Sequence, residues 1–109
     1  MAKIKFVTIE ALLEMLENKE DFRLVEVLRE EGYNEGHIPG AINIPVNSLN
    51  EDASKKLKKT DKIVVYCGSY SCHASTNAAR ILAEMGYGNV LDFKAGKKGW
   101  SDAGLELEK

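Results

Sequence analysis

The chain has 109 residues, of which 44% are hydrophobic and 29% charged, and its formal net charge is -2 at pH 7. A chain of this size and composition is predicted to form one globular domain over residues 1–109, and its slightly acidic balance argues against a nucleic-acid partner. It has no run of eighteen apolar residues and no signal-like stretch after the charged start MAKIK, so we expect a cytoplasmic protein with no membrane partner.

Strand-like and helix-like segments alternate along the first half of the chain. The run at 5–9 (KFVTI) predicts a short strand, and Thr8 can cap a helix whose apolar residues recur at three- and four-residue spacing: Ile9, Leu12, Leu13 and Leu16. A second strand is predicted over 22–28 (FRLVEVL) and, after a turn-rich segment, a third over 41–45 (AINIP). Asn47 or Ser48 can cap the next helix, which is predicted to run to about Leu57.

The second half of the chain contains the most continuous apolar run, at 61–67 (DKIVVYC), which is typical of a strand buried on both faces of a parallel sheet. A helix is predicted after it, ending at Gly86, then a strand over 89–93 (NVLDF) and a short closing helix or turn over 96–105. This alternation predicts an α/β fold, with a central, mostly parallel five-stranded sheet and helices on both sides.

Both cysteines of the chain lie in one segment, 66–76 (YCGSYSCHAST). Cys67 falls at the carboxyl end of a predicted strand, where open α/β sheets bind ligands. Backbone N–H groups of the following loop and the dipole of the next helix can stabilise an anion there, and a helix N-terminus can lower a cysteine pKa well below 8.5. The pattern therefore predicts a nucleophilic Cys67 and a substrate-binding loop made of Gly68, Ser69, Tyr70, Ser71, Cys72, His73 and Ala74.

Three ordered segments resemble the rhodanese-like sulfurtransferases, and the resemblance covers nearly the whole chain. The most specific is 24–45 (LVEVLREEGYNEGHIPGAINIP), and the others are 62–67 (KIVVYC) and 94–100 (KAGKKGW) with the following AGLELE. The resemblance implies a rhodanese-like fold in which Cys67 takes up sulfane sulfur as a persulfide. The donor would be of the thiosulfate or persulfide type, and the acceptor would be a thiol or cyanide.

The resemblance also implies the partners of the chain. We expect a small sulfur donor, or a persulfidated protein or thiol, to meet Cys67, and we expect neither a cofactor nor a metal to be required. The chain is expected to be a monomer or a weak homodimer.

The loop departs from the common family pattern, Cys-x-x-Gly-x-Arg-Ser, because no arginine occurs between Cys67 and Arg80. Aligned on the alanine pair that follows, the loop is about two residues longer, and it places Ala74 where the family has its arginine and Ser75 on the family serine. Glu26 takes the place of the usual aspartate. The substitute anion-binding groups are His73 and Arg29, and three further cations lie on segments that approach the same end of the sheet: Lys94, Lys97 and Lys98.

Two other functions are compatible with these residues. Rhodanese-fold phosphatases and arsenate reductases carry His-Cys-x5-Arg, and the sixth residue after Cys67 is His73, but Tyr66 and His73 replace the histidine and the arginine of that motif. An arginine binds a phosphoryl group through a planar fork of donors, which histidine lacks. A non-catalytic regulatory module or a sulfur carrier within a relay is the other alternative, although regulatory members commonly lack the cysteine that is present here.

Cys72 is open to three interpretations. It can act as a resolving or second thiol that attacks a persulfide on Cys67, it can itself be the primary nucleophile, or it can simply fill the inner face of the loop. A zinc site built from both cysteines with His73 and His37 is disfavoured, because the spacing is not that of a finger or ribbon and His37 belongs to a predicted turn.

Overall fold

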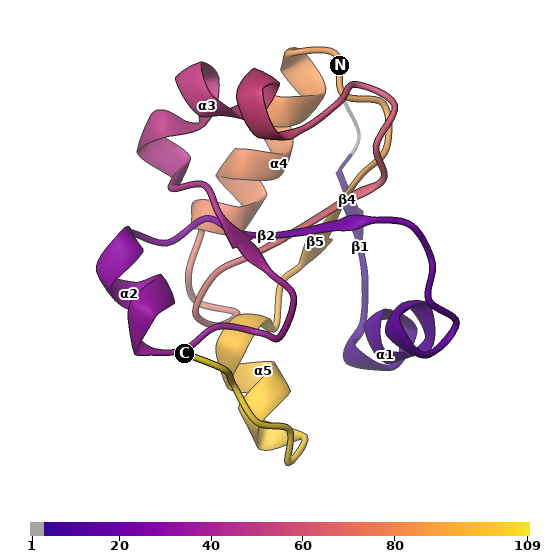
Figure 1. The fold of residues 1–109 in the computed structure, drawn as a ribbon, viewed down its shortest axis with the longest axis vertical. Coiled ribbons are helices and arrows are strands. Elements are labelled where there is room, and N and C mark those ends of the chain that lie inside the picture. Colours follow the sequence, from indigo (N-terminus) through magenta and orange to yellow (C-terminus); the bar gives the residue numbers. More distant parts are fainter. Residues whose placement is uncertain (1–3) are drawn as a thin grey trace.

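The computed structural model describes residues 4–109, in which five strands form one parallel sheet between two layers of helices (Figure 1). The strand order is β1-β5-β4-β2-β3, and every strand pairing is parallel. The predicted α/β class and the five-stranded sheet are therefore confirmed. The strands are β1 (Lys5–Phe6), β2 (Arg23–Glu26), β3 (Ile42–Asn43), β4 (Ile63–Tyr66) and β5 (Val90–Phe93).

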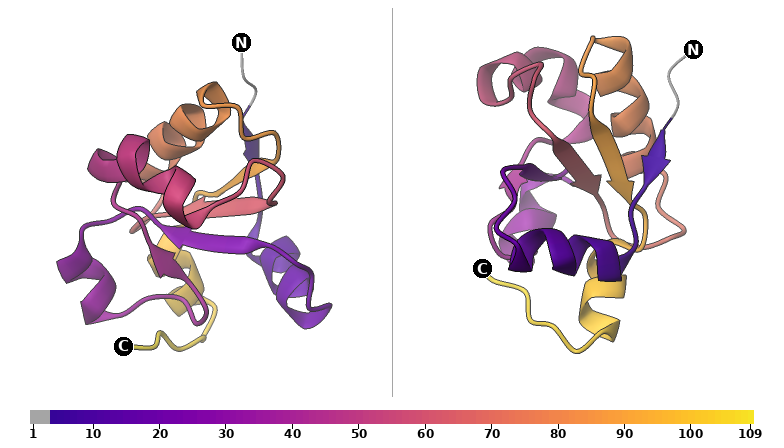
Figure 2. Two further views of the ribbon diagram at one scale, coloured as in Figure 1. Left: turned by 45° about the horizontal axis from the view of Figure 1, so that its top comes forward. Right: turned by 90° about the vertical axis from the view of Figure 1, so that its right-hand side faces the viewer.

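Helices cover both faces of the sheet, as predicted. The pair α3 and α4 lies on one face, and α1 and α5 lie on the other (Figure 2). Within residues 4–109, none of the helices is long and apolar enough to cross a membrane. The helices are α1 (Ile9–Glu17), α2 (Glu30–Glu35), α3 (Leu49–Lys56), α4 (Ala74–Glu84) and α5 (Gly96–Asp102), and a 3-10 turn, η1 (Val46–Ser48), precedes α3.

The central strand β4 is buried along its whole length, which matches its continuous apolar sequence. Because successive side chains of a strand point to opposite faces, Val65 and Cys67 join the core beneath α3 and α4, whereas Val64 and Tyr66 join the core beneath α1 and α5. The thiol of Cys67 is thus directed to the α4 side, and the Tyr66 phenol is directed to the α5 side.

Two local predictions have different outcomes. The predicted cap of α1 is confirmed, because the Thr8 hydroxyl accepts a hydrogen bond of 3.1 Å from the Ala11 backbone N–H. The turn-rich segment after β2 was not expected to contain a helix, yet it forms α2. This helix has no buried residue, so the segment lacks the apolar periodicity that would have indicated it.

The N-terminal end of α5 docks on the carboxyl end of β4. The backbone N–H groups of Lys97 and Lys98 donate to the carbonyl oxygens of Cys67 and Gly68, at 3.0 and 2.9 Å. This close approach requires a glycine at Gly96, whose φ is +63°. A Cβ atom there would overlap the carbonyl oxygen of Cys67 and lie 2.9 Å from its carbonyl carbon. Gly96 therefore sets how near α5 comes to the loop that carries both cysteines.

Replacing Gly96 tests this docking. We expect Gly96→Ala to lower the free energy of unfolding by about 2–5 kcal/mol, because a left-handed conformation costs a residue with a Cβ about 1–2 kcal/mol and overpacking adds about 1–3 kcal/mol. Gly104→Ala is the matched control, because Gly104 also has a positive φ but a Cβ there would meet no atom within 4 Å. Urea unfolding of both variants measures the difference, and equal losses would contradict the proposed steric role of Gly96.

Candidate active site

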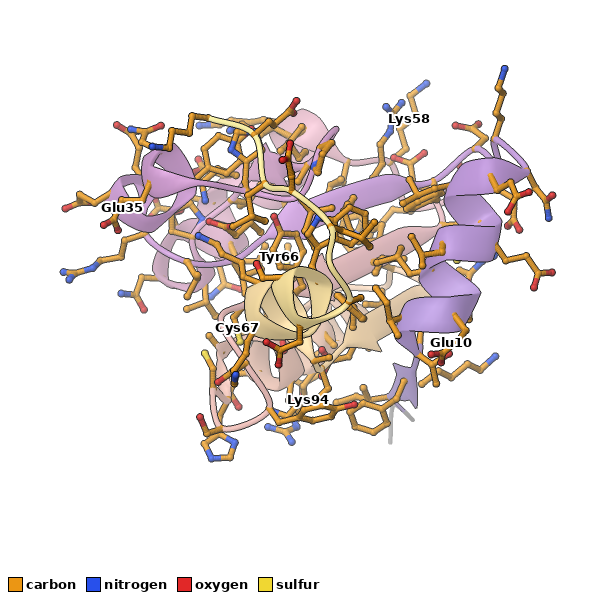
Figure 3. All side chains as sticks on the ribbon, turned by 90° about the horizontal axis from the view of Figure 1, so that it is seen from below. Glu10, Glu35, Lys58, Tyr66, Cys67 and Lys94 are labelled. Carbon is orange, nitrogen blue, oxygen red and sulfur yellow. The ribbon has the colours of Figure 1, made fainter. Side chains whose placement is uncertain are left out.

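Cys67 directly follows β4 at the carboxyl end of the sheet, and the loop after it leads into α4, which begins at Ala74. The strand arrows of β4 and β5 point toward α5 (Figure 2), and Cys67, Tyr66 and Lys94 are gathered around this helix (Figure 3). The side chain of Cys67 is fully buried, whereas Cys72 is half-buried, and both thiols are free. The site therefore contains one enclosed thiol and one that solvent can reach.

The loop between the two cysteines is folded back on itself by polar contacts. The Cys72 backbone N–H donates to the Ser69 carbonyl oxygen at 3.0 Å, and the hydroxyl oxygens of Ser69 and Ser71 are 2.9 Å apart. The Lys94 ammonium donates to the Cys72 carbonyl oxygen at 2.6 Å. These contacts hold Cys72 over Cys67, whose Sγ lies 3.5 Å from the same carbonyl oxygen.

The pKa of the Cys67 thiol is raised, mainly because burial disfavours its charged form and also because of its hydrogen bond with the Cys72 thiol. The hydroxyl and the backbone N–H of Ser75 act in the opposite direction, since both stabilise the Cys67 thiolate. Ser75 is itself fully buried, and its hydroxyl forms no hydrogen bond within residues 4–109, so it is free to donate to a thiolate. Ser75 is therefore the group placed to meet negative charge that develops on Cys67.

The pKa of Cys72 is lowered instead. Burial alone would raise this pKa, but the hydrogen bond from the Cys67 thiol, the backbone N–H groups of Gly68 and Ala74 and the charge of Lys94 together outweigh it. The expectation of a lowered pKa for Cys67 is thus wrong, because burial outweighs the contribution of Ser75 at the start of α4, and the amides of Gly68 and Ala74 act on Cys72 instead. The assignment of Cys67 as the nucleophile is a separate matter and stays a prediction.

The cations predicted to bind an anionic donor have different positions. His73 and Arg29 are both exposed at the N-terminal ends of their helices, and neither side chain caps its helix. Lys98 is also exposed and pairs with Asp102 at 3.2 Å. Lys94, which the sequence places only near this end of the sheet, has its ammonium bonded to the loop at the Cys72 carbonyl oxygen.

A buried ion pair supports the site from the α5 side. Glu26 is fully buried, its Oε1 is 3.2 Å from the Lys97 ammonium, and the same ammonium donates to the Gly32 carbonyl oxygen at 2.6 Å. Burial raises the pKa of Glu26, while the charge of Lys97 and a hydrogen bond from Tyr66 lower it. The pair holds α5 against the end of β2, and it therefore keeps the Lys97 backbone N–H in position to donate to the Cys67 carbonyl oxygen. The signal for this pair in the sequence is an acidic residue inside an apolar strand.

A cavity of about 310 Å³ lies beside the cysteine loop, between residues 69–71 and α5. The Tyr70 side chain, 70% exposed, is part of its lining. The cavity has room for a small molecule beside residues 69–71, and Cys72 is the thiol with access to solvent.

His37 makes contacts that stabilise the fold. Its ring stacks on Tyr33 with centroids 3.8 Å apart, and its Nε2 lies 3.3 Å from a carboxylate oxygen of Glu108. The chain end that carries Glu108 is seen beside α2 in Figure 1. Within the described part of the chain, no three His, Cys, Asp or Glu side chains cluster in a way that could hold a metal ion.

The chain is similar to known proteins over most of its length. The family model for the rhodanese-like domain matches residues 8–103. The putative sulfur carrier protein YrkF of Bacillus subtilis is 27% identical over 100 residues, which are 92% of this chain and 52% of YrkF, so the chain spans about half the length of that protein. The thiosulfate sulfurtransferase GlpE of Shewanella oneidensis is 30% identical over 106 residues, covering 94% of this chain and 98% of GlpE.

The solved structures agree with this assignment. The crystal structure of the BH2092 protein from Bacillus halodurans superposes with a TM-score of 0.88 at 34% sequence identity, covering 95% of this chain and 76% of that one. The five-stranded parallel sheet, the cysteine at the end of β4 and the family match over residues 8–103 are therefore consistent with one another. The chain belongs to the family of rhodanese-like domains.

Proposed function

We propose that this chain is a sulfurtransferase that carries sulfane sulfur as a persulfide on Cys67. The donor is of the thiosulfate or persulfide type, and the acceptor is a thiol or cyanide. The observation that carries the proposal is the enclosed Cys67 thiol at the carboxyl end of β4, faced by the Ser75 hydroxyl and N–H in a chain of the rhodanese-like family. The name of GlpE, a relative of nearly the same length, supports the same reaction.

The transfer has two steps. The Cys67 thiolate attacks the outer sulfur of a donor R–S–SH, the bond between the two donor sulfurs breaks, and R–S⁻ leaves while Cys67–S–SH forms. An acceptor thiolate then attacks the outer sulfur of this persulfide and releases the Cys67 thiolate. The Ser75 hydroxyl and N–H stabilise that thiolate before the first step and after the second.

The cations around the site favour a persulfide over thiosulfate as donor. Thiosulfate is a dianion, and the segment from Gly68 to Ala79, which comprises the loop and the start of α4, contains no arginine to bind it. The Lys94 ammonium is already bonded to the Cys72 carbonyl oxygen, and the Lys97 ammonium is paired with Glu26. A singly charged or neutral persulfide needs less compensating charge, so we expect it to reach Cys67 more easily.

Donor treatment followed by intact mass spectrometry tests the proposal. We expect the wild-type chain to take up sulfur faster from glutathione persulfide than from thiosulfate, by about tenfold or more, because a missing hydrogen bond to a charged group costs about 1.5–3 kcal/mol. Cys67→Ser is expected to lose the rapid uptake of sulfur, whereas Cys72→Ser is expected to take up sulfur as the wild-type chain does.

Other outcomes would decide against this assignment. Uptake by Cys67→Ser on Cys72 at the wild-type rate would show that the nucleophile is Cys72. Hydrolysis of an aryl phosphate without any sulfur uptake would favour the phosphatase alternative. Uptake from a persulfidated protein without turnover on small acceptors would favour a sulfur carrier in a relay, the second candidate, which the name of YrkF supports.

Restoring the missing arginine tests the donor preference. Ala74 begins α4 and is half-buried at the position that aligns with the family arginine. We expect Ala74→Arg to raise the ratio of kcat/KM for thiosulfate to that for glutathione persulfide about tenfold, because the guanidinium supplies charged hydrogen bonds to the dianion. Ala74→Gln, which adds length without charge, is the matched control and should leave the ratio near its wild-type value. An unchanged ratio in Ala74→Arg would mean that charge does not limit thiosulfate use.

A further inference from the structure

The two thiols of the cysteine loop differ in solvent access and in the direction in which their pKa values are shifted, yet the Cys67 sulfur contacts the backbone of Cys72. Cys67 is fully buried and Cys72 is half-buried. The Cys67 Sγ lies 3.5 Å from the Cys72 carbonyl oxygen, and the two thiols are near enough that each shifts the pKa of the other. The Lys94 ammonium and the turn to Ser69 hold Cys72 in this position. A sulfur atom added to Cys67 would therefore form beside a second nucleophile that is already in place.

We propose that the chain has a second activity, the release of hydrosulfide, in which Cys72 resolves the persulfide of Cys67. The Cys72 thiolate attacks the inner sulfur of Cys67–S–SH, the bond between the two persulfide sulfurs breaks, and HS⁻ leaves as a Cys67–Cys72 disulfide forms. Two molecules of a low-molecular-weight thiol then reduce this disulfide and are oxidised to their own disulfide, which returns both cysteines to thiols. The proposal rests on the proposed function, because that function supplies the persulfide.

The surroundings of Cys72 suit it to this attack. The nucleophile in thiol–disulfide exchange is the thiolate, and the backbone N–H groups of Gly68 and Ala74 and the charge of Lys94 stabilise the thiolate of Cys72. The attack is intramolecular, so it competes well with an external acceptor that would have to reach the buried sulfur of Cys67. The partial exposure of Cys72 gives a reducing thiol access to the disulfide.

A single-turnover experiment tests the resolving step. The reduced chain of residues 1–109 is treated with one equivalent of glutathione persulfide without any further thiol, and hydrosulfide and intact mass are followed together. We expect the wild-type chain to release hydrosulfide and to end with the loss of two hydrogens, the mark of a disulfide. Cys72→Ser and Cys72→Ala are expected to keep the added sulfur atom at least about tenfold longer, because they lack the oriented intramolecular thiol.

The outcomes separate this proposal from the proposed function. If Cys72→Ser never gains sulfur, the proposed function itself fails. If Cys72→Ser gains sulfur and loses it as fast as the wild-type chain, sulfur transfer stands and the resolving role is overturned. Mixing Cys67→Ser with Cys72→Ser should leave the persulfide as long-lived as in Cys72→Ser alone, and restoration of the wild-type rate in the mixture would overturn the intramolecular step.

The pH dependence of hydrosulfide release tests the role of Lys94. Lys94 is the charged group that acts on the Cys72 thiol, and it lowers the pKa of Cys72. The Cys67 thiol also lowers this pKa, but its S–H donor is absent once Cys67 carries sulfur. Release should therefore increase with pH as Cys72 loses its proton. This increase should occur at lower pH than the ionisation of an ordinary cysteine. In Lys94→Gln, which keeps a hydrogen-bond donor but removes the charge, we expect the increase to move to higher pH. An identical pH profile in Lys94→Gln and the wild-type chain would contradict the electrostatic role of Lys94.

Discussion

The docking of α5 on the carboxyl end of β4 is the constraint on which the rest of the site depends. Two backbone hydrogen bonds to the carbonyl oxygens of Cys67 and Gly68 fix the start of the loop, and the absence of a side chain at Gly96 allows them. The same segment presents Lys94 to the Cys72 carbonyl oxygen. Both ends of the cysteine loop are therefore oriented from one short stretch of the C-terminal part of the chain, although the loop itself belongs to β4 and α4.

This arrangement divides two properties between two thiols. The thiol at the strand end is enclosed, which keeps it from solvent and also raises the pKa of Cys67. The thiol at the helix start is accessible and receives the amide and lysine contacts that favour its charged form. A single cysteine cannot have both properties, because enclosure in an apolar setting removes the solvation that a thiolate needs. The loop of this chain combines them by placing two cysteines in contact.

The sheet, its helices and the position of Cys67 could be predicted because each depends on local patterns. A continuous apolar run specifies the buried β4, and a cysteine at its end necessarily lies at the carboxyl edge of the parallel sheet. The helix α2 could not be predicted, because it buries no apolar face. The relative acidity of Cys67 and Cys72 could also not be predicted from the sequence, because it depends on which sulfur atom each loop amide faces in the folded chain. The partner of Glu26 is Lys97, which lies far along the chain and whose contact no spacing rule indicates.

The Glu26–Lys97 pair also restricts how this site can evolve. Losing either partner alone leaves a buried charge without compensation, whereas exchanging both for apolar residues of similar volume is tolerated far better in proteins. The two positions should therefore co-vary among close homologues, either keeping opposite charges or losing them together. A lineage that alters the acidic end of β2 is then expected to alter α5, and through α5 the backbone donors that hold the loop after β4.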